Sequence, residues 1–408
     1  MRKEIVQLHG GVEDASIQLS WMWNPTALHP QPSSPHFRVF RREESEFIFG
    51  EDYEEYFHGL TWAAAPVVFD GLLTPSSDRR FSWVDSTVEV GKTYAYFVGT
   101  PQAEPIGPIA LKVRDPVVWW STQTLNERLD ALARRWPDLC RVWQCGLTTL
   151  GTPIPALQIG TGEEILGLVG LIHAGESGPE LIIPALEWVL EHEPELLATR
   201  SVVAIPAVNI DAREQLVRGN PWYLRKTVHG VDLNRNFPAS WETVDFMYGY
   251  KSSDQDGPTY RGAFPASAPE TQAVMRTFEE HHPNVVLSYH ALASICGLPA
   301  VASKDGENDA EYMDSCRQVM DIVDAAFPTN VKNDGPFYFG ASSGSLSTWL
   351  YQKFHIPAFD LEAGSNTDWL PALTDRTDRA LLEIYQRRHA NAIATVLRNQ
   401  SIFRANTK

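Results

Sequence analysis

Positive charge is scarce in this sequence of 408 residues. It contains 34 Lys and Arg residues and 51 Asp and Glu residues, which gives a formal charge of -17 at pH 7. Proteins that bind nucleic acid need clustered Lys and Arg, so this balance argues against a nucleic-acid partner. It argues equally against docking on an anionic membrane. No run approaches the roughly 20 apolar residues that are needed to span a bilayer.

Cysteine is also scarce. Its four residues are too few and too irregularly spaced for a disulfide scaffold, so we expect reduced and mostly buried thiols at Cys140, Cys145, Cys296 and Cys316. Residues 1–16 contain basic side chains but no apolar core of about 7–15 residues, which a signal peptide needs. A cytoplasmic protein is therefore expected, although secretion after removal of a leader would leave no trace here.

The composition is that of a folded protein, with 43% hydrophobic and 21% charged residues. The length exceeds the roughly 250–300 residues at which single cores stop growing, so two domains are expected. Residues 1–115 contain short runs in which apolar residues such as Ile17, Leu19 and Trp21 alternate with polar ones. Because turn residues separate these runs, they predict an all-β, immunoglobulin-like sandwich.

The pattern changes over residues 117–408. Continuous apolar segments at 165–172, 284–290 and 356–362 alternate with amphipathic helical segments. This alternation predicts an α/β fold with a mixed, mostly parallel sheet that is flanked by helices. Ligands of such folds bind outside the carboxyl ends of the strands, so the chemistry is expected at that edge.

Candidate metal ligands follow two of these segments. His173 and Glu176 come directly after the first one, and His290 ends the second. A catalytic zinc takes three protein ligands and leaves one position for water, which then needs a base. The third segment carries Asp360 and Glu362, which point to the same face of a regular strand. Glu362 lies nearer the carboxyl end and is the expected base, whereas Asp360 fits a hydrogen-bonded structural acid.

A polar loop between these segments is rich in arginine. Arg225, Asp232, Asn234 and Arg235 fall within eleven residues of an otherwise acidic chain. Arginine binds a carboxylate in a two-point fork that lysine cannot copy, so the loop suggests a site for an anionic group. A surface loop with solvated arginines is the other interpretation of this composition.

Taken in order, the segments HAGE, RKT, GVDLNRN, YRG with PASAPET, SYH and LEAG resemble the zinc carboxypeptidases related to carboxypeptidases A and B. The resemblance covers roughly residues 117–400. It implies one Zn²⁺ per chain and hydrolysis of the C-terminal bond of peptides or proteins by a zinc-bound water that Glu362 activates. It also implies that His173, Glu176 and His290 are the zinc ligands, that Arg225 stabilises the oxyanion, that Asn234 and Arg235 bind the substrate's free carboxylate, and that Asp232 orients His173.

A second resemblance concerns residues 1–115. The segments LSW, FRVFRRE and VEVGKTYAYFV are similar to a fibronectin type III domain, in which Tyr94 would be the tyrosine-corner residue. Domains of this kind bind or position other molecules. A protein partner for the N-terminal domain is therefore expected besides the peptide substrate.

Some positions depart from the zinc carboxypeptidase pattern. Gly175 stands where the family often has an arginine that helps to bind substrate. Tyr338 is the candidate for the family's mobile tyrosine, but an ungapped alignment places Gly340 there instead. The same alignment places Ser347 on the floor of the specificity pocket, which favours a neutral or apolar terminal side chain.

Three functions therefore stay open. The first is a zinc exopeptidase that removes C-terminal residues. The second is a related zinc amidohydrolase that acts on branched glutamyl or cell-wall-type peptides, for which the glycine at position 175 leaves room. The third is a non-catalytic binding protein on the same fold, which would be expected to have lost a metal ligand or the base.

Overall fold

The computed structural model describes residues 4–27, 31–44, 59–176, 178–221, 224–290, 300–326, 338–362, 379–399 and 402, with the backbone alone at 324–326, 338–339, 362 and 380–381. The chain divides into two compact units. The N-terminal unit consists of Met1–Trp119 with Gln215–Tyr223, and the α/β unit consists of Trp120–Glu214 with Leu224–Lys408.

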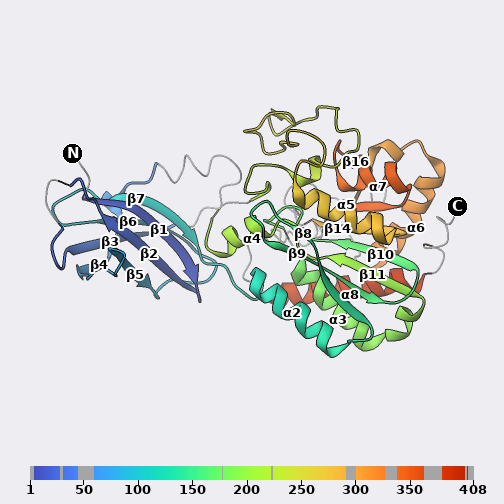
Figure 1. Ribbon diagram of the computed structural model, residues 1–408, viewed down its shortest axis with the longest axis horizontal. Coiled ribbons are helices and arrows are strands. Elements are labelled where there is room, and N and C mark those ends of the chain that lie inside the picture. Colours follow the sequence, from blue (N-terminus) through green and yellow to red (C-terminus); the bar gives the residue numbers. More distant parts are fainter. Residues whose placement is uncertain are drawn as a thin grey trace. The chain divides into compact units, whose positions relative to one another are not determined.

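The described part of the N-terminal unit forms two antiparallel sheets (Figure 1). One has the strand order β1-β2-β5 and the other β4-β3-β6-β7. The elements are β1 (Ile5–Glu13), β2 (Ser16–Trp23), β3 (His36–Glu44), the short helix η1 (Trp62–Ala64), β4 (Val67–Leu72), β5 (Arg80–Asp85), β6 (Thr93–Gly99) and β7 (Ile106–Lys112).

The alternation in the sequence selects the core of this unit. Ile17, Leu19 and Trp21 of β2 are at most 1% exposed, as the sequence pattern predicted. Phe37 of β3 packs against Trp21 with ring centroids 5.3 Å apart. Burial of such aromatic side chains is the main favourable term for a sandwich of this size.

A segment from the middle of the chain completes the N-terminal unit. The Val12 N–H donates to Arg218 O at 2.9 Å, and the Lys112 N–H donates to Gly219 O at 2.7 Å. Gly219 has a φ of +105°, and a Cβ there would lie 2.7 Å from Val12 Cγ2, so the contact requires glycine. The sequence pattern did not predict that this later segment belongs to the N-terminal unit.

The α/β unit contains one mixed sheet with the strand order β16-β15-β17-β14-β10-β11-β9-β8. Neighbours are parallel at β16/β15, β17/β14, β14/β10 and β10/β11, and the other pairs are antiparallel. The strands are β8 (Cys140–Leu147), β9 (Pro153–Gly160), β10 (Glu164–Val169), β11 (Arg200–Ile205), β14 (Val285–His290), β15 (Ala300–Ser303), β16 (Tyr338–Ala341) and β17 (Ala358–Glu362), and a separate hairpin pairs β12 (Phe246–Met247) with β13 (Tyr250–Lys251).

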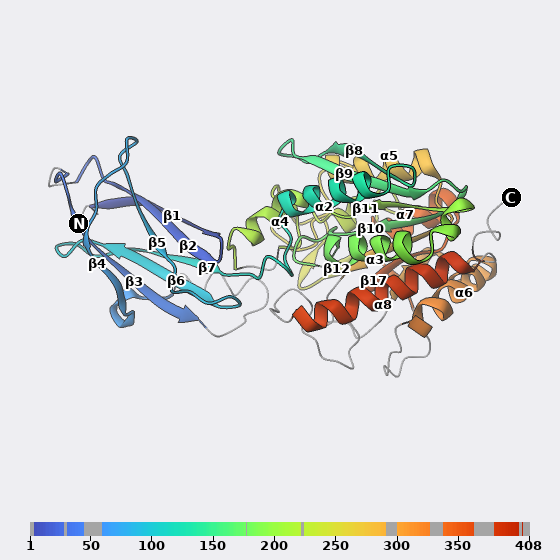
Figure 2. The ribbon, with the colours of Figure 1, turned by 90° about the horizontal axis from the view of Figure 1, so that it is seen from below.

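Helices cover both faces of this sheet. Figures 1 and 2 show α2, α3 and α8 on one face and α5 and α7 on the other. Leu125, Leu129 and Leu132, the predicted apolar face of α2, are buried. The helices are α2 (Thr122–Arg135), α3 (Pro179–His192), α4 (Ile210–Val217), α5 (Pro269–His281), α6 (Ala310–Ala326), α7 (Leu346–Phe354) and α8 (Arg379–Arg398), and the short helices are η2 (Pro194–Ala198), η3 (Leu233–Arg235) and η4 (Lys304–Gly306).

Three adjacent parallel strands, β17, β14 and β10, bring their carboxyl ends to one edge. β14 ends at His290, whose register partner on β17 is Glu362. β10 ends at Val169, so the prediction of a strand that runs directly into His173 was wrong. The chain turns earlier because Leu171 adopts a positive φ of 49°, which a strand does not accommodate.

Two further properties concern cysteines and membranes. Cys140, Cys145 and Cys316 are free thiols, and Cys296 lies outside the described residues. Among the described helices, none has the length and apolar character to cross a bilayer.

Candidate active site

A buried cluster of two histidines and one carboxylate lies at this edge of the sheet. The side chains of His173, Glu176 and His290 are 4% exposed or less. His173 Nδ1 lies 2.9 Å from Glu176 Oε1, and His290 Nδ1 lies 2.9 Å from Glu176 Oε2. Their donor atoms all fall within 4.8 Å of one another. The three predicted ligands therefore converge on one point.

Electrostatics keep the carboxylate of this cluster charged. Burial alone would raise the pKa of Glu176, but the facing His173 and His290 lower it below its usual range. An ionised carboxylate is the form of this ligand that a divalent cation requires.

Asp232 connects this cluster to the arginine-bearing loop. Its Oδ1 lies 3.1 Å from His173 Nε2, on the side of the ring away from Glu176. Its Oδ2 accepts from Arg225 Nε at 2.8 Å. Burial opposes its charge, while Arg225 and His173 lower the pKa of Asp232 well below its usual range. A carboxylate on the second ring nitrogen fixes the tautomer of a metal-binding histidine.

The short helix η3, which carries Asn234 and Arg235, begins directly after this aspartate. The Asn234 N–H donates to Asp232 Oδ1 at 3.0 Å, so Asp232 caps η3. The Asn234 amide donates from Nδ2 to Asp360 Oδ2 at 2.8 Å and accepts the Leu346 N–H at 2.9 Å. Within the described residues, the second Nδ2 hydrogen of Asn234 has no acceptor and is available for one.

Arg235 is a buried cation beside these groups. It is 5% exposed, and its Nη1 donates to the backbone O of Asn234 at 2.8 Å. Its Nη2 lies 3.2 Å from the Sδ of Met247, a weak acceptor, and its Nε has no acceptor among the described residues. Burial, together with the charge of Arg225, lowers the pKa of Arg235 from its usual value, and nearby carboxylates oppose this. A buried cation of this kind favours an anionic partner.

A second ion pair supports the turn that carries two metal-ligand candidates. Arg213 Nη1 donates to the backbone oxygens of Ala174 and Glu176 at 3.1 and 3.3 Å. Its Nη2 donates to the Glu180 carboxylate at the start of α3, and this carboxylate also accepts the Trp120 N–H at 2.9 Å. No local sequence pattern predicts this pair, because Arg213 lies on α4 and Glu180 on α3.

Four other predicted positions have different outcomes. Asp360 is buried and hydrogen-bonded, as expected for a structural acid. The backbone of Glu362 lies beside His290, but the side chains of Glu362 and Tyr338 are outside the described part of the structure. Ser347 is 1% exposed in the first turn of α7.

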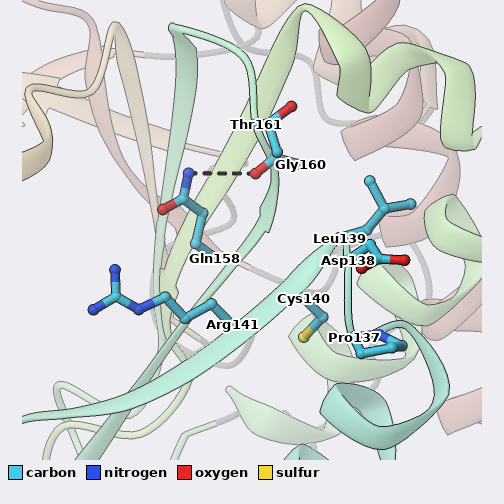
Figure 3. A pocket seen from close by; sticks show the side chains of 8 residues that line it. All are labelled: Pro137, Asp138, Leu139, Cys140, Arg141, Gln158, Gly160 and Thr161. Atoms are coloured by element: carbon cyan, nitrogen blue, oxygen red, sulfur yellow. Dashed lines mark hydrogen bonds between the residues drawn. The ribbon is translucent and has the colours of Figure 1, made fainter.

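A cavity of about 340 Å³ lies elsewhere in the α/β unit, between the start of β8 and the end of β9 (Figure 3). Cys140, Arg141 and Gln158 are among its lining residues, and Gln158 Nε2 donates to Gly160 O at 3.4 Å. Burial raises the pKa of the Cys140 thiol to about 11, which makes it a poor nucleophile near neutral pH. The candidate chemistry therefore belongs to the strand edge.

A mixed α/β sheet with a buried His-Glu-His cluster at its carboxyl edge is the arrangement of a fold that can bind a metal ion there. The profile of the family described as zinc carboxypeptidase matches residues 125–380, which is more than half of the chain. The chain belongs to this family, whose members are zinc-dependent hydrolases.

Curated relatives within this family have more than one activity. Murein peptide amidase A of Escherichia coli (strain K12) is 28% identical over 146 residues, which are 31% of this chain and 60% of that protein. Human carboxypeptidase O is 24% identical over 270 residues, which are 60% of this chain and 70% of that protein. The chain thus spans about 60% of the length of the first curated relatives that it matches.

Solved structures share the fold. Bovine thrombin-activatable fibrinolysis inhibitor, in complex with tick carboxypeptidase inhibitor, superimposes with a TM-score of 0.56 at 17% identity. The match covers 70% of this chain and 98% of that chain.

The cluster fits the zinc that the family uses. Two imidazole nitrogens and one carboxylate oxygen are the ligand set of catalytic zinc sites that keep a position for water. With bonds of about 2.0–2.2 Å, tetrahedral donors lie about 3.3 Å apart. The two separations of 2.9 Å in the cluster are close to this value. His173, Glu176 and His290 would hold the ion.

Proposed function

We propose that this protein is a zinc metallocarboxypeptidase that removes residues from the free C-terminus of peptides or proteins. The observation that carries the proposal is the buried guanidinium of Arg235, which lacks an acceptor for its Nε among the described residues. A contact chain connects Arg235 with the metal cluster through Asn234 and Asp232. A terminal carboxylate bound there would place the last peptide bond near the metal.

The chain's own residues divide the remaining work. Zinc, when bound, polarises the scissile carbonyl and lowers the pKa of water. Glu362 takes the proton of the attacking water and returns it to the leaving amine. Arg225, oriented by Asp232, donates to the developing oxyanion, a contribution of about 3–4 kcal/mol for one donor. Asn234 and Arg235 bind the substrate's terminal carboxylate.

Mass spectrometry of a peptide pool tests this proposal. Half of the peptides carry a free C-terminal acid and half carry an amide, and each reaction is run with zinc and with a chelator. We expect chelator-sensitive loss of single C-terminal residues from the free acids alone. Cleavage of acids and amides at equal rates would refute the role of Arg235 in binding a carboxylate.

The second candidate is an amidase for branched glutamyl or cell-wall-type peptides. Gly175 and the similarity to murein peptide amidase A favour it. Its signature is zinc binding and no exopeptidase activity on linear peptides, together with cleavage of γ-glutamyl amides. A chain that neither binds zinc nor cleaves any of these substrates would indicate a binding protein.

For the N-terminal unit we propose a fibronectin type III-like domain that binds or positions another protein. The strand orders β1-β2-β5 and β4-β3-β6-β7 support it. Further support comes from the Tyr94 hydroxyl, which accepts the Glu89 N–H at 3.0 Å just before β6. Capture of a specific protein by the full chain, lost on substitution of exposed residues of this unit, would test the partner role.

A further inference from the structure

His290 needs a partner on the side of its ring that faces away from the metal. Its Nδ1 lies 2.9 Å from Glu176 Oε2, so this nitrogen belongs to the metal cluster. A metal held through Nδ1 leaves the ring proton on Nε2. His290 is 3% exposed, and a buried N–H requires an acceptor.

Within the described part of the chain, the side chains of Ser288 and Asp360 face this nitrogen. Ser288 Oγ lies 3.1 Å from His290 Nε2, and Asp360 Oδ1 lies 3.7 Å from it. The strand register explains both positions, because Ser288 precedes His290 by two residues on β14 and pairs with Asp360 on β17. The sheet itself therefore brings a carboxylate to the back of the second metal-ligand candidate.

Asp360 has one oxygen committed and one without a hydrogen bond. Its Oδ2 accepts from Asn234 Nδ2 at 2.8 Å. Its Oδ1 is buried and has no hydrogen-bond partner in the described part of the chain, while His290 Nε2 lies within ion-pair distance. A buried carboxylate oxygen without a donor is costly, so an N–H directed toward it is strongly favoured.

We propose that Asp360 is a positioning residue that holds His290 for the metal and Asn234 for the substrate. It repeats on β17 what Asp232 does for His173 and for the Asn234 backbone. The Asn234 half rests on the proposed carboxypeptidase function, whereas the His290 half requires only that the cluster binds zinc.

The first test is the zinc affinity of Asp360→Asn in the full-length chain. This substitution keeps the shape and an oxygen for Asn234 but removes the charge that faces His290. Loss of such outer partners costs about 10–100-fold in metal affinity, so we expect the zinc dissociation constant to rise at least about 10-fold. Competition with a chromophoric chelator measures it without any peptidase assay.

Two variants serve as controls for this measurement. Ser288→Ala removes the other partner of His290 Nε2, and we expect it to weaken zinc binding less than Asp360→Asn. Asp309→Asn changes an acid that pairs with Tyr351 and His355 away from the cluster, and it should leave the zinc dissociation constant unchanged. An unchanged constant in Asp360→Asn, with loss of affinity in Ser288→Ala, would overturn the His290 half.

The substrate half has its own readout. At saturating zinc, Asp360→Ala frees the Asn234 amide, so KM for a free-acid peptide should rise several-fold while kcat changes less. Asp360→Asn should restore KM toward the original value. An unchanged KM in Asp360→Ala would overturn this half. If the unsubstituted chain cleaves no peptide, the proposed function fails, and the zinc measurement still decides the role toward His290.

Discussion

Arg235 carries its charge in a position that water hardly reaches. It is 5% exposed, and its described contacts are a backbone oxygen and the sulfur of Met247. Keeping a cation in such a place is costly unless an anion completes the site. At the scale of single residues, this guanidinium is the strongest sign of an anionic substrate group.

Arg235→Ala should therefore lose far more activity on free-acid peptides than on C-terminally amidated ones. We expect a loss of about 100-fold in kcat/KM for the free acids, which corresponds to about 2.7 kcal/mol. Steady-state rates on matched peptide pairs measure it. Arg135→Ala, which removes an exposed arginine of α2, is the control and should change neither rate. Equal losses on both peptides would exclude the carboxylate-binding role.

The sequence predicted the residues of the candidate site. It did not predict the contacts from other helices that hold these residues in position. The apolar segments before His173 and His290 predicted that both lie at one edge, because carboxyl ends of parallel strands share it, although β10 itself ends at Val169. The pairing of Arg213 with Glu180 was not predicted, because the two residues lie 33 positions apart and the helix that carries Arg213 was not predicted either. Long-range contacts between helices have no periodic signature in a single sequence.

At the scale of elements, the same limit applies to the fold. The sequence predicted β10, β14 and β17 from their apolar runs and α2 from its amphipathic pattern. These elements are predictable because a buried face selects apolar residues at regular spacing. β1, β8 and α6 were not predicted. β8 lies at the edge of its sheet, and all its residues except Cys140 are exposed or half-buried, so its apolar signal is weak.

The turn between β10 and α3 depends on the ion pair between α3 and α4. Arg213→Met should lower the free energy of unfolding by about 3–5 kcal/mol, because it leaves the Glu180 charge buried without its cation. It should also raise the zinc dissociation constant, because the backbone of Ala174 and Glu176 loses its donor. Denaturant titration and chelator competition measure the two effects.

The double variant Arg213→Met with Glu180→Gln separates these effects. Removing the unpaired charge should recover part of the stability. Zinc binding should stay weak, because the donor to the turn is still missing. Full recovery of zinc affinity in the double variant would show that the ion pair has no role in positioning the metal-ligand turn.

At the scale of the whole molecule, the chain passes between its two units at residues 119/120, 214/215 and 223/224. All three metal-ligand candidates belong to the α/β unit. In the N-terminal unit, Asp85 is 2% exposed and accepts from Arg41 at 2.8 Å and from Tyr96 at 2.9 Å. The metal cluster in the α/β unit and Asp85 in the N-terminal unit can therefore be changed separately.

Calorimetry of the full chain should resolve two transitions that respond to different changes. Zinc at about 100 times its dissociation constant should stabilise the α/β unit by about 2.7 kcal/mol, since only the folded unit presents the cluster. Asp85→Ala should lower the other transition, because it leaves Arg41 and Tyr96 without their buried acceptor. Zinc should raise the transition temperature of the α/β unit by the same amount in the unsubstituted chain and in Asp85→Ala. A single transition that moves with both changes would mean that residues 215–221 make the two units unfold together.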